Sequence, residues 1–260
     1  MGNPLLQSIH EFWPPLFSKM KDLVYLLVDY PNQIRKLPTT QASVPTRHIS
    51  LFLSNWMEII TNVAVSSDDF FGSRFQAAWP TMVKLLNHCT EVKMSNKYKN
   101  LSKTTGDTLD RISFEKIVNS LGDRNSDSEK SNDLILISTL SCIENIFSSS
   151  KLGVRLSHLI PVAGTIILPL LSDENEVGEI ALKSLKCLLS IDCDSLWRPL
   201  LKLSGIGLSK EPLVKSEEHR NHESVVIAEH SLLRSRALDL ILYVRNLPEQ
   251  SFPNLFAQLS

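Results

Sequence analysis

Hydrophobic residues recur every three or four positions along most of the chain, which is the spacing of one face of an α-helix. The clearest case is residues 174–191, where the stripe consists of Val177, Ile180, Ala181, Ser184, Leu185, Leu188 and Leu189. Ser172 or Asp173 can cap the first amides of this segment, and Glu174, Glu176 and Glu179 lie near the positive end of its dipole. We therefore predict a helix over residues 174–191.

The same spacing predicts further helices along the chain. Long ones are expected over residues 49–65, 132–147 and 225–247, and shorter ones over 5–12, 14–20, 70–78, 80–89 and 195–203. The most apolar run, residues 159–171, is shorter than the roughly 20 residues that span a bilayer, so we expect a buried helix there. Period-two alternation, the signal of strands, is scarce. The predicted fold class is all-α.

Three polar or proline-rich segments interrupt the helical pattern, at residues 30–47, 120–133 and 205–224. Apolar helical spacing resumes promptly on both sides of each. We therefore expect flexible loops between helices and not domain linkers, so that residues 1–260 form a single domain.

Tryptophan–proline pairs stand inside two of the apolar helical stretches, at Trp13–Pro14 and Trp79–Pro80. Proline is favoured at the first position of a helix, where its missing N–H costs nothing. Each pair is therefore interpreted as a corner that ends one helix and begins the next, with the tryptophan wedged between the two.

The spacing of the prolines indicates a repeat. Pro161 and Pro199 are 38 residues apart, Pro80 and Pro161 are 81 apart, and Pro14 and Pro80 are 66 apart. Helical repeats of the HEAT and armadillo type are about 40–47 residues long. The pattern predicts an α-solenoid of antiparallel helical hairpins; the alternative is an irregular helical domain in which the prolines fall by chance.

Composition limits the classes of function. The chain has 27 basic and 28 acidic residues, which argues against a nucleic-acid groove, and its 43% hydrophobic content is enough for a sizeable core. No secretory signal or membrane span is predicted, so a cytoplasmic location is expected, with a nuclear one as the further option. The cysteines form no CxxC pair and are expected to be reduced and packed as small hydrophobic residues; they are Cys89, Cys142, Cys187 and Cys193.

Candidate chemistry is sparse. The histidine pair in residues 219–223, HRNHE, lacks further ligands and is interpreted as part of a solvated loop. Asp192 and Asp194 stand where a helix begins and are expected to cap it. The basic run at residues 93–103 is interpreted as a solvated connection, and the four tryptophans as core residues in preference to exposed binding residues. No catalytic, cofactor or metal site is predicted, and the protein is expected not to be an enzyme.

Two stretches resemble the Tti-one family, the large helical-repeat subunit of the Tel-two/Tti-one/Tti-two (triple T) complex. The first comprises Asp69, Phe70, Phe71, Arg74, Phe75, Trp79 and Pro80. The second is a helix over residues 180–191 followed by a turn with Ser190, Asp192, Asp194 and Trp197. Family members are much longer, so this chain would correspond to their C-terminal part.

The resemblance implies an adaptor without catalytic activity. It would bind Tel-two-like and Tti-two-like subunits and, with the Hsp90 chaperone system, help to mature phosphatidylinositol-3-kinase-related kinases. Neither nucleic acid nor a membrane is implied as a partner.

Two other functions stay open. One is a different HEAT-repeat adaptor, such as a nuclear-transport-receptor-like protein, whose partners would be Ran or cargo. The other is an all-helical enzyme with a site assembled from distant residues such as His88 or His158. Residues 1–20 lack the polar face that caps a repeat array, so an exposed apolar surface is also expected there.

Overall fold

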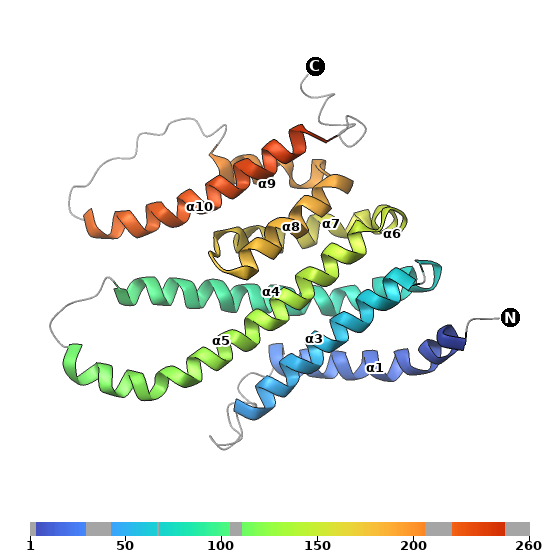
Figure 1. The fold of residues 1–260 in the computed structure, drawn as a ribbon, viewed down its shortest axis with the longest axis horizontal. Helices are drawn as coiled ribbons and strands as arrows, with labels where there is room; N and C mark the ends of the chain where they lie inside the picture. Colours follow the sequence, from blue (N-terminus) through green and yellow to red (C-terminus); the bar gives the residue numbers. More distant parts are fainter. Residues whose placement is uncertain (1–3, 30–42, 67, 105–110, 206–219, 248–260) are drawn as a thin grey trace.

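The computed structural model describes residues 4–29, 43–66, 68–104, 111–205 and 220–247, and within these ranges every regular element is helical (Figure 1). The longer helices are α1 (Pro4–Asp29), α3 (Ser43–Ser66), α4 (Asp68–Thr104), α5 (Arg111–Ser148), α8 (Glu176–Ile191), α9 (Asp194–Ser204) and α10 (Arg220–Arg245). Shorter helices lie between α5 and α8; they are α6 (Ser150–Arg155), η1 (Ser157–Leu159), α7 (Ile160–Ile167) and η2 (Leu168–Ser172). The all-α prediction is confirmed for the described residues.

The helices form two layers. In one layer α3 packs against α5, α5 against α8, and α8 against α10, and Figure 1 shows these four running roughly side by side. In the other layer α1 packs against α4, α4 against α7, and α7 against α9. Contacts between the layers join α4 to α5, α7 and η2 to α8, and α9 to α10.

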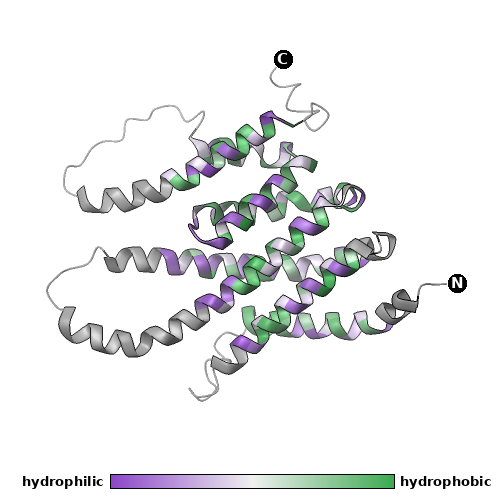
Figure 2. Cartoon of the chain, viewed as in Figure 1, coloured by the Kyte–Doolittle hydropathy of each residue, from purple (hydrophilic) through white to green (hydrophobic). Residues whose placement is uncertain are grey.

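The core lies between the two layers, and its buried residues come from helices of both. Figure 2 shows hydrophobic residues recurring along the described helices. Helix α8 follows its prediction closely. Its buried residues are Val177, Gly178, Ala181, Ser184, Leu185, Leu188 and Leu189, and Glu176 and Glu179 stand in its first turn. Residues 159–171 are also helical and largely buried, as predicted, although they divide into two elements. Pro161 lies in the first turn of α7, and Pro169 lies at the start of the tighter η2.

The prediction of a helix corner at each tryptophan–proline pair is wrong. Pro14 and Pro15 lie inside α1, and Pro80 lies inside α4. All three prolines are on the exposed side of their helices. Because a proline has no N–H, the carbonyl four residues earlier lacks its usual donor, and on this side water can hydrate it. Proline is therefore tolerated inside these long helices, and the two short helices expected on either side of each pair are one.

Two other predicted irregular segments are helical. Residues 120–133 lie within α5, and the run at residues 93–103 lies within α4. Of the predicted loop at residues 30–47, positions 43–47 belong to α3; of the loop at 205–224, positions 220–224 belong to α10. The remainder of these two loops, apart from Gly205 after α9, falls outside the described residues.

Aromatic side chains join the layers at two places. Trp13 of α1 packs 6.0 Å from Trp56 of α3, measured between ring centroids. In α4, Trp79 contacts Phe75 at 5.5 Å and reaches Phe147 of α5 at 6.4 Å. Trp13, Trp56 and Trp79 are buried, and Trp197 is partly buried against the same core, so the prediction that the tryptophans are core residues is confirmed.

Candidate functional site

The residues that carry the family resemblance lie in two different helix pairs. Phe75 and Trp79 are buried in the α4–α5 contact, whereas Pro80 is exposed and Arg74 is half-buried. Asp69, Phe70 and Phe71 belong to the first turn of α4, and their side chains fall outside the described residues. The buried members of this motif therefore serve packing.

The second motif begins α9. Asp192 follows α8, and its Oδ1 accepts a hydrogen bond of 3.3 Å from the backbone N–H of Ser195. This bond satisfies one of the first amides of α9, so the capping prediction is confirmed for Asp192. Asp194 is the first residue of α9, and Trp197 packs against the core one turn later.

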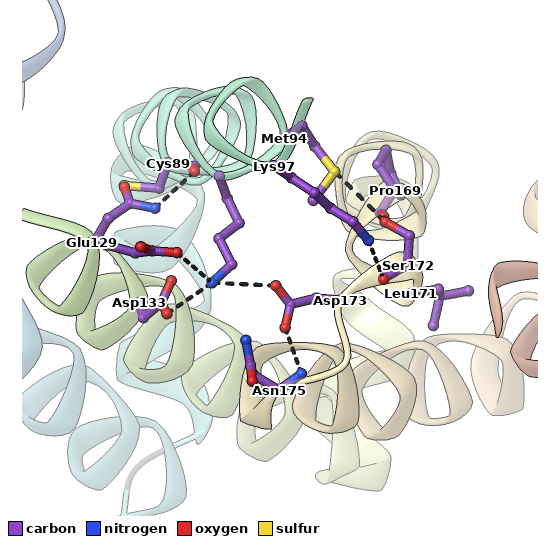
Figure 3. Close-up of polar contacts among 12 residues, drawn as sticks. Cys89, Met94, Lys97, Glu129, Asp133, Pro169, Leu171, Ser172, Asp173 and Asn175 are labelled. Atoms are coloured by element: carbon purple, nitrogen blue, oxygen red, sulfur yellow. Dashed lines mark hydrogen bonds and ion pairs between the residues drawn. The ribbon is translucent and has the colours of Figure 1, made fainter. Parts of the chain in front are cut away.

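The most concentrated polar chemistry in the described residues is a buried charge cluster that sequence reasoning missed (Figure 3). The side chain of Lys93, on α4, is only 5% exposed. Its Nζ lies 2.8 Å from a carboxylate oxygen of Asp133 on α5 and 3.2 Å from one of Asp173, in the turn before α8. Glu129 lies farther away, at 3.8 Å, and is about half exposed.

The turn at residues 171–175, which we call the Asp173 turn, is held from several sides. The other carboxylate oxygen of Asp173 accepts a 2.7 Å hydrogen bond from the N–H of Asn175. From α4, the Nζ of Lys97 donates to the carbonyl of Ser172 (Figure 3). The expected capping of α8 by Asp173 thus takes a different form, because its carboxylate bonds Asn175 ahead of the helix and Lys93 across the core.

Arg236 reaches the same turn from α10. Its guanidinium donates to the carbonyls of Leu171, at 3.0 Å, and of Asp173, and it also bonds Glu179 of α8. Gly178 makes this arrangement possible, since a Cβ at that position would collide with the Asp173 carbonyl and the Arg236 guanidinium. Asp173 therefore contacts α4 through its carboxylate and α10 through its carbonyl, and Lys93 of α4 joins it to Asp133 of α5.

The charge of Lys93 decides what this cluster can do chemically. Burial lowers the pKa of Lys93, but the hydrogen bond to Asp133 and the charges of Asp173 and Asp133 outweigh it, so the pKa is raised above its ordinary value of 10.5. A lysine held protonated is neither a nucleophile nor a general base near neutral pH. The geometry suits buried ion pairs that hold helices together and not covalent or acid–base catalysis.

His88, one of the residues considered for a catalytic site, is half-buried in α4. Burial lowers the pKa of His88, against the opposing effect of Glu91 and Asp29. No group of three or more histidine, cysteine, aspartate or glutamate side chains among the described residues has metal-binding geometry. Within the same part of the chain, no helix has both the length and the apolar character to cross a bilayer.

The four cysteines are free thiols, and all but the half-buried Cys187 are buried, as predicted for small hydrophobic core residues. Burial raises the pKa of Cys89, Cys142 and Cys193 to about 12 and that of Cys187 to about 11. The thiolate is the reactive form, and it is at least about a hundredfold scarcer at these pKa values than at the ordinary one.

We therefore expect all four thiols to react slowly with a disulfide reagent such as DTNB at about pH 8 in the folded protein. In urea, where burial is lost, all four are expected to react rapidly. Counting released thiolate with time in the two conditions checks this. A thiol that reacts in the folded protein at its unfolded rate would contradict the packing described here.

A comparison of the chain with protein-family models, with curated proteins and with solved structures finds no match in any of the three.

Proposed function

We propose that this protein is a non-catalytic scaffold of HEAT type, an α-solenoid that binds other large helical proteins. The observation that supports it most is the two-layer arrangement of consecutive helix pairs, α1 with α3, α4 with α5, α7 with α8, and α9 with α10. In such an array each pair buries one face on its neighbours and leaves a side for partners.

The prolines add support from the sequence. Pro14, Pro80, Pro161 and Pro199 all fall in the layer formed by α1, α4, α7 and α9. Their spacing therefore marks the first helix of each pair and not the corner between two helices. A recurring residue at equivalent elements is what an internal repeat produces.

The partners we propose follow from the family resemblance. As a relative of the C-terminal part of the Tti-one family, the chain would bind Tel-two-like and Tti-two-like subunits in the cytoplasm or nucleus. It would act with Hsp90 on phosphatidylinositol-3-kinase-related kinases.

Co-precipitation of the tagged chain from cells, followed by mass spectrometry, tests this proposal. We expect Tel-two-like and Tti-two-like subunits to be enriched over a control with an unrelated helical protein of similar size. Recovery of Ran or transport cargo without those subunits would replace the proposal with the transport-receptor alternative. Recovery of neither group would overturn the scaffold assignment.

A further inference from the structure

A line of apolar side chains on α1 is only partly covered by the core, against which Leu16 packs. Phe12 is 68% exposed and Leu26 is 40% exposed, and Leu16 and Leu23 are half-buried between them. With the exposed Lys19 at its midpoint, this line advances by four, three, four and three residues, which keeps it on one side of the helix. We call these five residues the α1 ribbon. The exposed Phe12 agrees with the apolar surface expected from the sequence at residues 1–20, and Leu26 lies beyond that range.

The α1 ribbon faces away from the helix that neighbours α1 in its own layer. Trp13, Met20 and Val24 form the buried stripe of α1, and Trp13 contacts Trp56 of α3. On the flank of that stripe away from the α1 ribbon, Tyr25 and Asp29 contact the same lysine of α4, Lys84.

The α1 ribbon lies on the other flank of the buried stripe, away from Lys84. With 3.6 residues per turn, this is where Phe12, Leu16 and Leu23 project. Figure 1 shows α1 at one edge of the described helices, with α4 on its inner side. The α1 ribbon therefore occupies the side on which a further helix of this layer would pack.

We propose that the α1 ribbon binds one amphipathic helix of a partner protein, and that this helix carries an acidic residue opposite Lys19. The inference rests on the proposed scaffold function and names the kind of partner surface it uses. Phe12 to Leu26 cover about four helical turns, or roughly 21 Å, which suits a single helix laid along α1. The four apolar side chains supply the contact area, and the one cation within them selects the register and the partner.

A second copy of the chain is the less favoured occupant because of the position of Lys19. If two copies paired about a two-fold axis along the whole length of this surface, the midpoints of both ribbons would meet. Lys19 of one copy would then face Lys19 of the other within an apolar contact, and like charges in such a place oppose association. A helix with an acidic residue at that point removes the conflict.

Two designed helical peptides test the proposal directly. Both are about 18 residues long and carry leucines at the spacing of the α1 ribbon, and they differ only in a central Glu or Lys. Fluorescence anisotropy measures the binding of each to the full chain and to its variants Lys19→Glu, Phe12→Ser and Leu242→Ser. Leu242 is the matched control, since it is an exposed apolar residue on α10. Circular dichroism melting verifies that each variant is folded.

We expect the unaltered chain to bind the Glu peptide about fivefold more tightly than the Lys peptide, and Lys19→Glu to reverse that order. Phe12→Ser is expected to weaken both by about tenfold or more because it removes the largest apolar contact, whereas Leu242→Ser changes neither. An order that Lys19→Glu does not reverse, or equal binding by Phe12→Ser, would overturn the proposal. So would a dimer in sedimentation velocity that Phe12→Ser dissociates, because the occupant would then be a second copy.

The same variants separate this inference from the proposed function. If Phe12→Ser still co-precipitates the helical subunits and neither peptide binds, the scaffold function stands and the α1 ribbon is not its partner surface. If no partner co-precipitates with any form, the scaffold function fails, while peptide binding with the expected charge dependence still supports the ribbon as a helix-binding surface.

Discussion

Replacing Lys93 with methionine is expected to lower the free energy of unfolding by about 3–5 kcal/mol, because two carboxylates lose the buried cation that they share. Asp173 is as buried as Lys93, and Asp133 lies 2.8 Å from the lysine Nζ. Methionine has a similar length but no charge, so the loss reports the ion pairs and not a cavity. Urea denaturation followed by circular dichroism measures it.

The control is Lys84→Met on the same helix. Lys84 pairs with Asp29 at the surface, where such pairs contribute at most about 1 kcal/mol. The double variant Lys93→Met with Asp173→Asn is expected to lose clearly less than the two single losses added together, since each single change leaves an uncompensated buried group. Additive losses of unfolding free energy, or equal losses for Lys93→Met and Lys84→Met, would contradict a stabilising role of the buried ion pairs.

The contribution of Lys93 also has a predictable pH dependence. Its pKa is raised above 10.5 in the folded chain, so the unfolded chain loses this proton first as the pH rises. The stabilisation is therefore fully present below about pH 10.5 and is lost as the pH rises through the higher folded pKa. The stability difference between the unaltered chain and Lys93→Met should be constant from about pH 7 to 9 and shrink at more alkaline pH.

Gly178→Ala is expected to destabilise the protein by about 2–4 kcal/mol, although alanine is the better helix former by about 1 kcal/mol. A methyl group at this position would collide with the carbonyl of Asp173, which is backbone and cannot rotate away, and with the guanidinium of Arg236. Separating these groups breaks the hydrogen bonds that tie α10 to the Asp173 turn.

Lys183→Ala serves as the control for Gly178→Ala. It places the same residue at an exposed position of the same helix, and its effect is expected to stay within about 0.5 kcal/mol. Amide hydrogen exchange measures the local effect. In Gly178→Ala, the amides of α10 should lose more protection than those of α3. A stabilised Gly178→Ala protein would mean that helix propensity prevails and that the close approach at Gly178 is not required.

Much of the helical structure could be predicted because helices are specified locally. The stripe from Val177 to Leu189 predicted α8 almost to the residue, since spacing, first-turn acids and flanking polar residues all agree. The tryptophan–proline pairs could not be interpreted correctly from local rules. Proline is allowed both at the first position of a helix and on the exposed side of a long one, and only the course of α1 and α4 in the structure distinguishes the two.

The buried charge cluster could have been predicted in part from the sequence, because two of its cations lie on apolar helix stripes. Lys93 follows Met82, Leu86 and Cys89 at steps of four, three and four, so it continues a buried stripe. Arg236 stands in the same way between Leu233 and Ala237 on α10. A cation on an apolar stripe predicts a buried partner. Lys93 was interpreted instead as part of the basic run at residues 93–103, and Arg236 was not considered.

Local sequence specifies the helical class, the positions of the apolar stripes and the packing of the cysteines, because each depends on neighbours within a few turns. The recurrence of proline could be read from its positions in the chain. Tertiary packing was needed to show that these prolines belong to helices of one layer, three of them inside the helix and Pro161 in the first turn. It was also needed to show that Lys93, Asp133, Asp173 and Arg236 meet around one turn. These residues are up to 143 positions apart in the chain, and the spacing of residues along one helix carries no information on which other helix will supply the opposite charge.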